Sequence, residues 1–179
     1  MGGCTIDGTI LQVIFQNEEN GYTVLRLTTD DGEVVTVVGT IPCAAPGENL
    51  IVTGRWVSHP VHGDQIQAEQ VERHLPTTED EILSYLASGV IKGIGHTLAD
   101  RIVQRFGVRA LEVMEEEPEL LSKIKGITAR KAQEIGESYR YQTGMRRLLE
   151  FLSLNDLPLS LALRLYRHYG AEALERMEQ

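Results

Sequence analysis

The stretch Lys92-Gly93-Ile94-Gly95 opens an amphipathic segment, and the sequence repeats it as Lys125-Gly126-Ile127-Thr128. In each copy a lysine precedes a tight, glycine-containing turn, and the apolar spacing behind the turn predicts a new helix. The first amide groups of a helix have no partner inside it and carry the positive end of the helix dipole. Each copy therefore predicts a place where backbone amides and a lysine converge on an anion such as a phosphate.

A third, degenerate copy supports the interpretation of these turns as a repeat. Residues 98–115 realign on residues 161–178 with one constant offset, which places Asp156-Leu157-Pro158 opposite the first turn. This third turn keeps an apolar central residue but has neither the glycines nor the lysine, so we expect it to be structural. Repeated helical units stack to bury their apolar faces. The third repeat also looks truncated at its C-terminal end.

The composition restricts where a nucleic acid could bind. The chain has 179 residues, 42% of them hydrophobic, and a formal net charge of −9. Residues 1–75 hold three basic residues against ten acidic ones, whereas residues 76–179 hold fourteen against sixteen. We therefore expect phosphate contacts from the second half. No apolar run approaches the roughly 20 residues of a membrane span, so we expect a cytoplasmic protein with no membrane contact. The cysteines and histidines lack the spacing of metal ligands, so we expect no metal site.

The first part of the chain alternates apolar and polar residues with turn signals every eight to twelve residues. This period of two predicts strands, and five strands without an intervening helix favour a small OB-like β-barrel. The large aromatic residues of this part are few and its charge is acidic, so we expect a scaffold or docking role in preference to DNA binding by the barrel. The expected strands are 6–15, 22–27, 33–38, 50–57 and 65–71.

After Pro76 the pattern becomes helical. Thr78 and Glu81 have the spacing of a capping box. We expect helices over 97–106, 108–115, 128–141, 144–153, 160–169 and 171–177, with one further helical turn opened by Pro118. The expected fold is thus α+β and multidomain, with an OB-like barrel over residues 1–75 and an all-α repeat domain over residues 76–179. Arg146 and Arg147 are expected on a helix surface.

The turn residues have separable expected roles. Gly93 and Gly95 are expected to adopt backbone angles that other residues avoid and to let a phosphate approach the chain without a Cβ in the way. Ile94 is expected to point inward, and Thr128 to act as a helix N-cap whose hydroxyl can also meet a phosphate oxygen. No residues form a catalytic set. The candidate DNA-binding residues are Lys92, Gly93, Gly95, Thr97, Arg101, Lys125, Gly126, Thr128 and Lys131.

The two turns resemble the helix-hairpin-helix motif, in which an apolar residue lies between two glycines and a small residue follows four positions later. The resemblance covers residues 83–106 well, with Ala99 at the small position, and residues 119–135 less well, because Thr128 replaces the second glycine. It implies binding to the sugar–phosphate backbone without base readout.

The order of parts resembles the N-terminal region of the RecD-like DNA helicases. The resemblance rests on short sequence segments that occur in this order: residues 17–22, 54–56, 63–65, 75–78 and 93–95. It implies a parent protein whose C-terminal motor unwinds DNA 5′ to 3′ with ATP and Mg²⁺, and partners that are DNA and that motor. No Gly-Lys-Ser/Thr occurs in the sequence, so we expect this region itself to be non-catalytic. The alternative is a protein–protein or interdomain scaffold that does not contact DNA.

Overall fold

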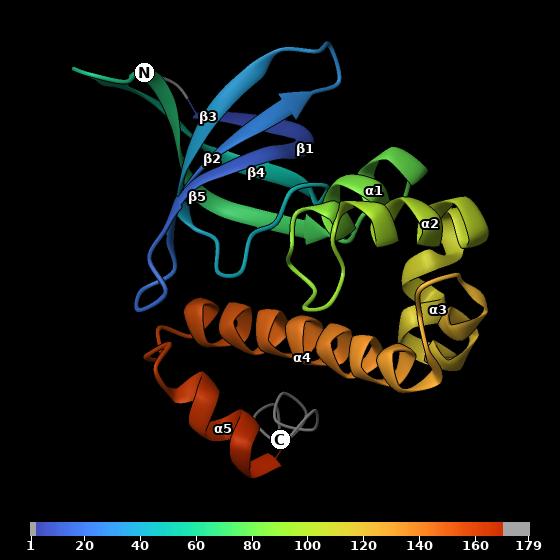
Figure 1. Ribbon diagram of the computed structural model, residues 1–179. Helices are drawn as coiled ribbons and strands as arrows, with labels where there is room; N and C mark the ends of the chain where they lie inside the picture. The colour runs from blue at the N-terminus through green and yellow to red at the C-terminus, as the bar shows by residue number, and fades with distance from the viewer. Residues whose placement is uncertain (1–2, 170–179) are drawn as a thin grey trace.

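The structure is a computed structural model and describes residues 3–169. A β-barrel lies above a helical region that curves back beneath it, so that the longest helix runs under the barrel (Figure 1). The closed strand order is β1-β2-β3-β5-β4, with β3 and β5 parallel and the other pairs antiparallel. The expectation of a five-stranded OB-like barrel is confirmed. The strands are β1 (Gly3–Gln16), β2 (Tyr22–Thr29), β3 (Val34–Thr40), β4 (Asn49–His59) and β5 (Gly63–His74).

The barrel closes because β1 is long enough to pair with two neighbours. Its first half pairs with β4 and its second half with β2, and register shifts at Ile10/Gln12 and Val13/Phe15 bend it between them. The alternating apolar side chains of the strands then meet inside the barrel. Fully buried members of this core include Ile10, Leu25, Leu27, Val37, Leu50, Val52 and Ile66.

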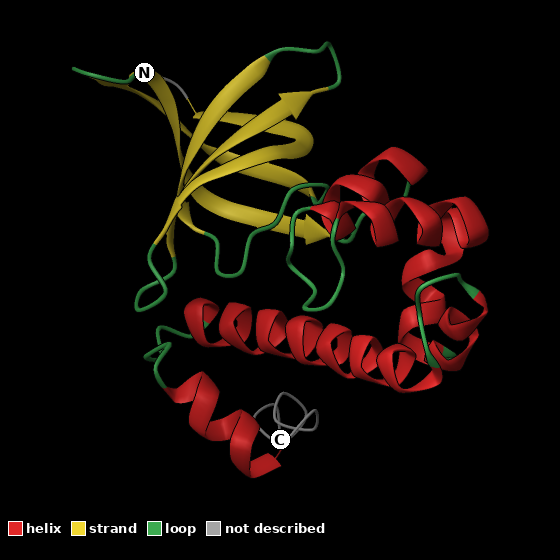
Figure 2. Cartoon of the chain, in the orientation of Figure 1, coloured by secondary structure: helices red, strands yellow, loops and turns green. Residues whose placement is uncertain are grey.

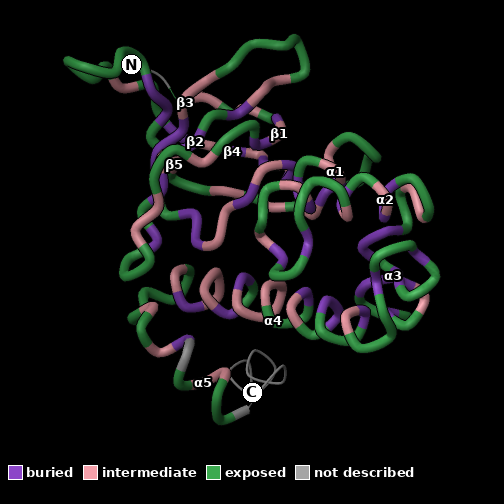
Figure 3. Tube along the Cα trace, in the orientation of Figure 1, coloured by how far each residue is buried: buried purple, intermediate pink, exposed green. Residues whose placement is uncertain are grey.

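The helical region is a series of short helices followed by one long one (Figure 2). The capping box predicted at Thr78 and Glu81 is present at the start of the first helix. Buried and exposed positions alternate along the helices with the period expected of amphipathic segments (Figure 3). The elements are α1 (Glu79–Ala87), α2 (His96–Phe106), η1 (Gly107–Arg109), α3 (Ala110–Glu116), η2 (Pro118–Lys123), α4 (Ala129–Leu154) and α5 (Leu161–Tyr169).

Helix α4 corrects one expectation, because it is a single helix of 26 residues where two helices with a break near 142–143 were expected. Thr143 does not end it, since its hydroxyl donates back to the Tyr139 carbonyl at 3.1 Å. Gly144 is used for packing: a Cβ there would lie 3.1 Å from Cε2 of Tyr166 in α5. The helix expected over 171–177 lies outside the described residues.

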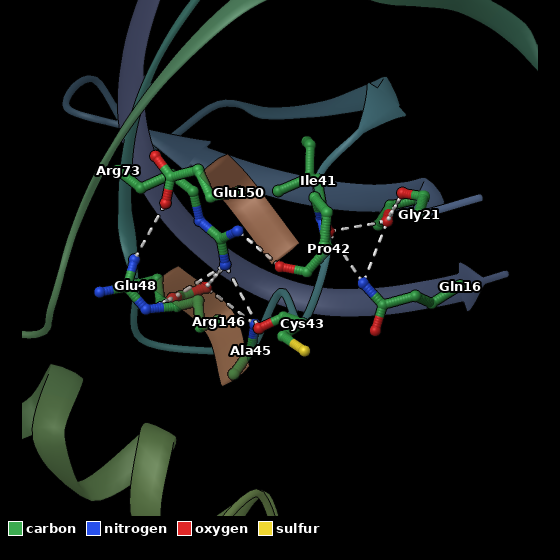
Figure 4. Close-up of polar contacts among 11 residues, drawn as sticks. Gln16, Gly21, Ile41, Pro42, Cys43, Ala45, Glu48, Arg73, Arg146 and Glu150 are labelled. Atoms are coloured by element: carbon green, nitrogen blue, oxygen red, sulfur yellow. Dashed lines mark hydrogen bonds and ion pairs between the residues drawn. The ribbon is translucent and has the colours of Figure 1, made fainter. Parts of the chain in front are cut away.

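A buried ion network joins the barrel to α4 (Figure 4). Glu48, just before β4, accepts from Arg73 Nη2 at 3.1 Å with both carboxylate oxygens, and its Oε1 lies 3.9 Å from Nε of Arg146. The three side chains are 1%, 2% and 10% exposed. The expectation that Arg146 lies on the helix surface is wrong, because the barrel covers this part of α4 and supplies a carboxylate.

A second seam lies at α1. Glu81 accepts from the Asn49 amide at 3.0 Å and from the Thr9 hydroxyl at 3.3 Å. Gly47 has φ +90°, and a Cβ there would lie 2.2 Å from the Glu81 carbonyl oxygen. Only glycine fits such an approach of two backbones. The barrel and the helices are therefore packed directly against each other.

Candidate nucleic-acid interface

The two lysine–glycine turns have the same backbone geometry. Gly93 has φ +97° and Gly126 has φ +95°, both in the region that favours glycine. The amides of Ile94 and Ile127 each donate to the carbonyl three residues earlier, at 3.3 and 3.1 Å. Both isoleucine side chains are 4% exposed and pack in the helical core. The prediction that Ile94 points inward is confirmed, and the repeat is visible in the conformation as well as in the sequence.

The two turns pack reciprocally on each other's helices. A Cβ at Gly126 would lie 3.2 Å from Arg101 Nη1 and 3.6 Å from Leu98, both on α2, while a Cβ at Gly93 would lie 3.6 Å from Ile135 on α4. Arg101 also donates from Nη1 to the Lys125 carbonyl at 3.0 Å. Arg101 thus holds the second turn in place, a role that the sequence did not indicate.

The helix N-termini behind the turns differ in how many amides they leave free. Thr128 is the N-cap of α4, as predicted, and its hydroxyl accepts from the Lys131 amide at 3.1 Å. Gly95 is the N-cap of α2 and has no side chain to do this. Within residues 3–169 no hydrogen-bond acceptor meets the amides of His96, Thr97 and Leu98. The first turn therefore offers one more amide to an anion than the second.

Gly95 requires a correction. Its φ of −102° and ψ of −169° are extended backbone that any residue adopts, so the expectation of a forbidden conformation holds for Gly93 and not for Gly95. A Cβ at Gly95 would meet open space. What glycine contributes at this position is room for an approaching ligand.

The structure brings some of the candidate residues together and separates others. Lys92, Gly93 and Lys131 line one groove, whose volume is about 810 Å³. Gly95 and Thr97 are exposed at the start of α2. Lys125, Gly126 and Thr128 are exposed at the second turn. No side chain of the acidic barrel lines this groove within the described part of the chain.

Helix α4 adds residues to this groove that the sequence reasoning missed. Ser138, Tyr141 and Gln142 follow Lys131 at helical spacing and lie on the same wall, and Tyr166 of α5 completes it. The spacing of seven, ten and eleven residues after Lys131 was the available signal. Ser138 and Tyr141 already lay within the expected helix 128–141, and only Gln142 fell in the expected break; nothing in the sequence indicated that this face of the helix lines a groove.

The third turn differs from the other two in charge but keeps one backbone feature. Asp156, at the position equivalent to Gly93, has φ +55° although it is not a glycine. Aspartate is one of the few residues that tolerate this region. A carboxylate in this turn, in place of the lysine and glycine of the first two, disfavours an anion there.

Other candidate features contribute no chemistry. His59 Nδ1 accepts the amides of Val61 and His62 at 3.1 Å, which orders the β4–β5 loop. No cluster of three or more possible metal ligands is found among residues 3–169. None of the described helices is long and apolar enough to cross a membrane.

Comparison with known proteins identifies the class of the barrel. Residues 4–76 match the family model described as "ATP-dependent DNA helicase YrrC, OB-fold domain". The matched range begins in β1 and ends just after β5, so it corresponds to the closed barrel of the structure. The barrel is thus an OB-fold domain of the kind found in these helicases.

The chain as a whole is similar to the ATP-dependent RecD2 DNA helicase of Deinococcus radiodurans. The two are 29% identical over 181 aligned positions, which cover 97% of this chain and 25% of that protein. The chain therefore spans about a quarter of the length of this relative. Together the two comparisons support a similarity of this chain to the N-terminal OB-fold region of the RecD-like helicases.

Proposed function

We propose that this chain is the non-catalytic N-terminal region of an ATP-dependent 5′–3′ DNA helicase of the cytoplasm, and that it holds the DNA backbone without base readout through two helix-hairpin-helix turns. The motor of the same polypeptide would bind ATP and Mg²⁺. The 179-residue sequence contains no Gly-Lys-Ser/Thr and so no P-loop.

The observation that carries this proposal is the pair of turns with matched backbone geometry. Each has a positive-φ glycine, an inward isoleucine and an exposed lysine immediately before the glycine. Helix N-termini of this kind favour phosphates. Because the net charge is −9, we expect weak binding that depends on local lysines and falls steeply with salt.

The test is the salt dependence of duplex binding by a variant with Lys92→Glu and Lys125→Glu. Removing one phosphate interaction reduces the slope of log K against log salt by about 1, so we expect a reduction of about 2. The matched control is Arg26→Glu with Arg105→Glu, which changes the net charge equally at two exposed positions away from the turns. Equal slopes for the two double variants would contradict the proposal.

The second candidate is an interdomain scaffold, and the buried seam favours it for the barrel. Glu48, Arg73 and Arg146 tie the barrel to α4, which gives the barrel a docking role inside this chain. Titration of labelled duplex and labelled single strand at low and moderate salt separates the candidates, because a pure scaffold binds neither.

A further inference from the structure

We propose that the groove beside the first turn holds an unpaired nucleotide, with its base against Tyr141 and its phosphate between Lys92 and Lys131. The preferred ligand is then DNA with a single-stranded segment, and not a fully paired duplex. This inference rests on the proposed function, since it assigns a substrate class to the same turn.

The groove has two chemically different ends. Lys92 and Lys131 lie at the turn end, beside Gly93. Both glutamates on its wall are exposed: Glu134 is paired with Arg130 at 3.4 Å, and Glu137 lies farther along α4. A phosphate is therefore favoured between the lysines and repelled beyond them. A neutral base suits the remaining length of the groove.

That remaining length is lined by groups that can bind a base. Tyr141 is 44% exposed, and its ring meets the ring of Tyr166 edge-on, with centroids 5.0 Å apart and planes at 80°. Because Gly144 leaves room for Tyr166 against α4, the pair is held in place before any ligand arrives. Ser138 and Gln142 lie on the same wall and supply a hydroxyl and an amide for the base edge.

A base can use this site only if it is unpaired. In a duplex both faces of each base are covered by its neighbours, whereas in a single strand a face is open for an aromatic side chain. The barrel is a weaker place for the same interaction. Phe15 and Tyr22 are exposed there, but Glu18 and Glu19 lie in the loop between them and residues 1–75 contain no lysine.

The test uses residues 1–179 and two DNA probes, a blunt duplex and the same duplex with a short single-stranded tail that carries 2-aminopurine. The fluorescence of this base analogue falls when it stacks. We expect the tailed probe to bind more tightly than the blunt one and its fluorescence to be quenched. Tyr141→Leu should weaken binding of the tailed probe about tenfold, within the range for one stacked base, and abolish the quenching.

Two variants control for loss of the fold and for stacking elsewhere. Tyr141→Phe keeps the ring and should retain both the affinity and the quenching. Tyr22→Leu removes an aromatic side chain from the barrel and should change neither. Thermal unfolding of each variant shows whether the chain is still folded.

The outcomes separate this inference from the proposed function. If the tail adds no affinity and Tyr141→Leu equals the wild type, while Lys92→Glu with Lys125→Glu still flattens the salt slope, the inference is wrong and the proposed function stands. If neither probe binds at low salt, both are wrong. Quenching that is lost in Tyr22→Leu instead would place the base on the barrel and overturn the inference.

Discussion

At the scale of single residues, the two glycines of the first turn have different jobs although they stand two positions apart. Gly93 has a positive φ that an L-residue adopts only with strain, whereas Gly95 has ordinary extended backbone and faces open space. The sequence alone treats them alike. In the structure, glycine is needed for its backbone conformation at position 93, whereas at position 95 it leaves open space beside the chain.

This difference predicts that alanine substitutions at the two glycines lower the free energy of unfolding by different amounts. Gly93→Ala should lower the free energy of unfolding by about 1–2 kcal/mol, the cost of left-handed backbone at a residue with a Cβ. Gly95→Ala should cost less than Gly93→Ala, about 0.5 kcal/mol, because the backbone is unstrained there and the only loss is that alanine is a poorer N-cap than glycine. Urea denaturation of the two variants and the wild type measures both values. Equal destabilisation by the two variants would contradict the assignment.

The N-cap of α2 gives a second prediction at this scale. Gly95→Ser adds a hydroxyl that can accept the Leu98 amide, as Thr128 accepts the Lys131 amide in α4. We expect a gain of a few tenths of a kcal/mol in stability. We also expect weaker duplex binding, because one free amide is removed from the first turn. Gly95→Ala is the matched control, since it adds a Cβ without a hydroxyl; unchanged affinity in Gly95→Ser would show that the amide is not used.

At the scale of elements, α1 is fixed to the barrel by one carboxylate. Burial acts to raise the pKa of Glu81, but hydrogen bonds from four neighbours outweigh it and hold the pKa below its usual value. These neighbours are the Asn49 side chain, the Thr77 and Thr78 amides and the Thr9 hydroxyl. A carboxyl whose pKa is lower in the folded state stabilises the fold above its unfolded pKa, which is about 4.3 for glutamate.

This contribution is lost as the pH falls through the folded-state pKa, so it predicts a pH-dependent effect of Glu81→Gln. The variant should be less stable than the wild type at neutral pH, and the difference should shrink as the pH falls below about 4. Urea denaturation at a series of pH values measures it. Asp80→Asn is the matched control, since it removes a charge from the same turn without removing a hydrogen bond to the barrel among residues 3–169. A pH-independent difference for Glu81→Gln would refute the role.

The elements also show how far local sequence signals reach. The period of two in the barrel, the Thr78 capping box and the inward Ile94 are set by nearby residues, and the sequence predicted them. The glycine within α4 has a tertiary reason, because Tyr166 of another helix packs where a Cβ at Gly144 would lie. A mid-helix glycine costs about 1 kcal/mol relative to alanine and does not by itself end a helix, so Gly144 was weak evidence for the expected break.

At the scale of the whole molecule, the buried ion network could not be predicted because its three members come from the loop before β4, from β5 and from α4. Arginine on a polar stretch of helix is usually exposed, and nothing in the sequence indicates that Glu48 lies opposite Arg146. The same holds for the groove, since it depends on α5 lying beside α4. The ion network and the groove both depend on contacts between residues that lie far apart in the sequence.

The network predicts that the barrel and helices unfold together. Glu48→Gln leaves the buried Arg73 without a counter-charge and leaves Arg146 only its exposed-side partner Glu150, at 3.5 Å, so we expect a loss of about 3 kcal/mol in stability. Arg146→Met should cost less, because Glu48 keeps its pair with Arg73 at 3.1 Å. Thermal unfolding followed by Trp56 fluorescence, which reports the barrel, and by far-ultraviolet circular dichroism, which reports the helices, should show one coincident transition. Two separated transitions would contradict the coupling.

The left-handed Asp156 has a consequence for engineering. The chain already bends there at a residue with positive φ, +55° at Asp156 compared with +97° at Gly93, so this turn is the natural place for a third lysine–glycine turn. Replacing Asn155-Asp156-Leu157-Pro158 by Lys-Gly-Leu-Gly would reproduce the first corner at the far end of α4. Under the proposed function, such a graft would add a third contact to the DNA backbone.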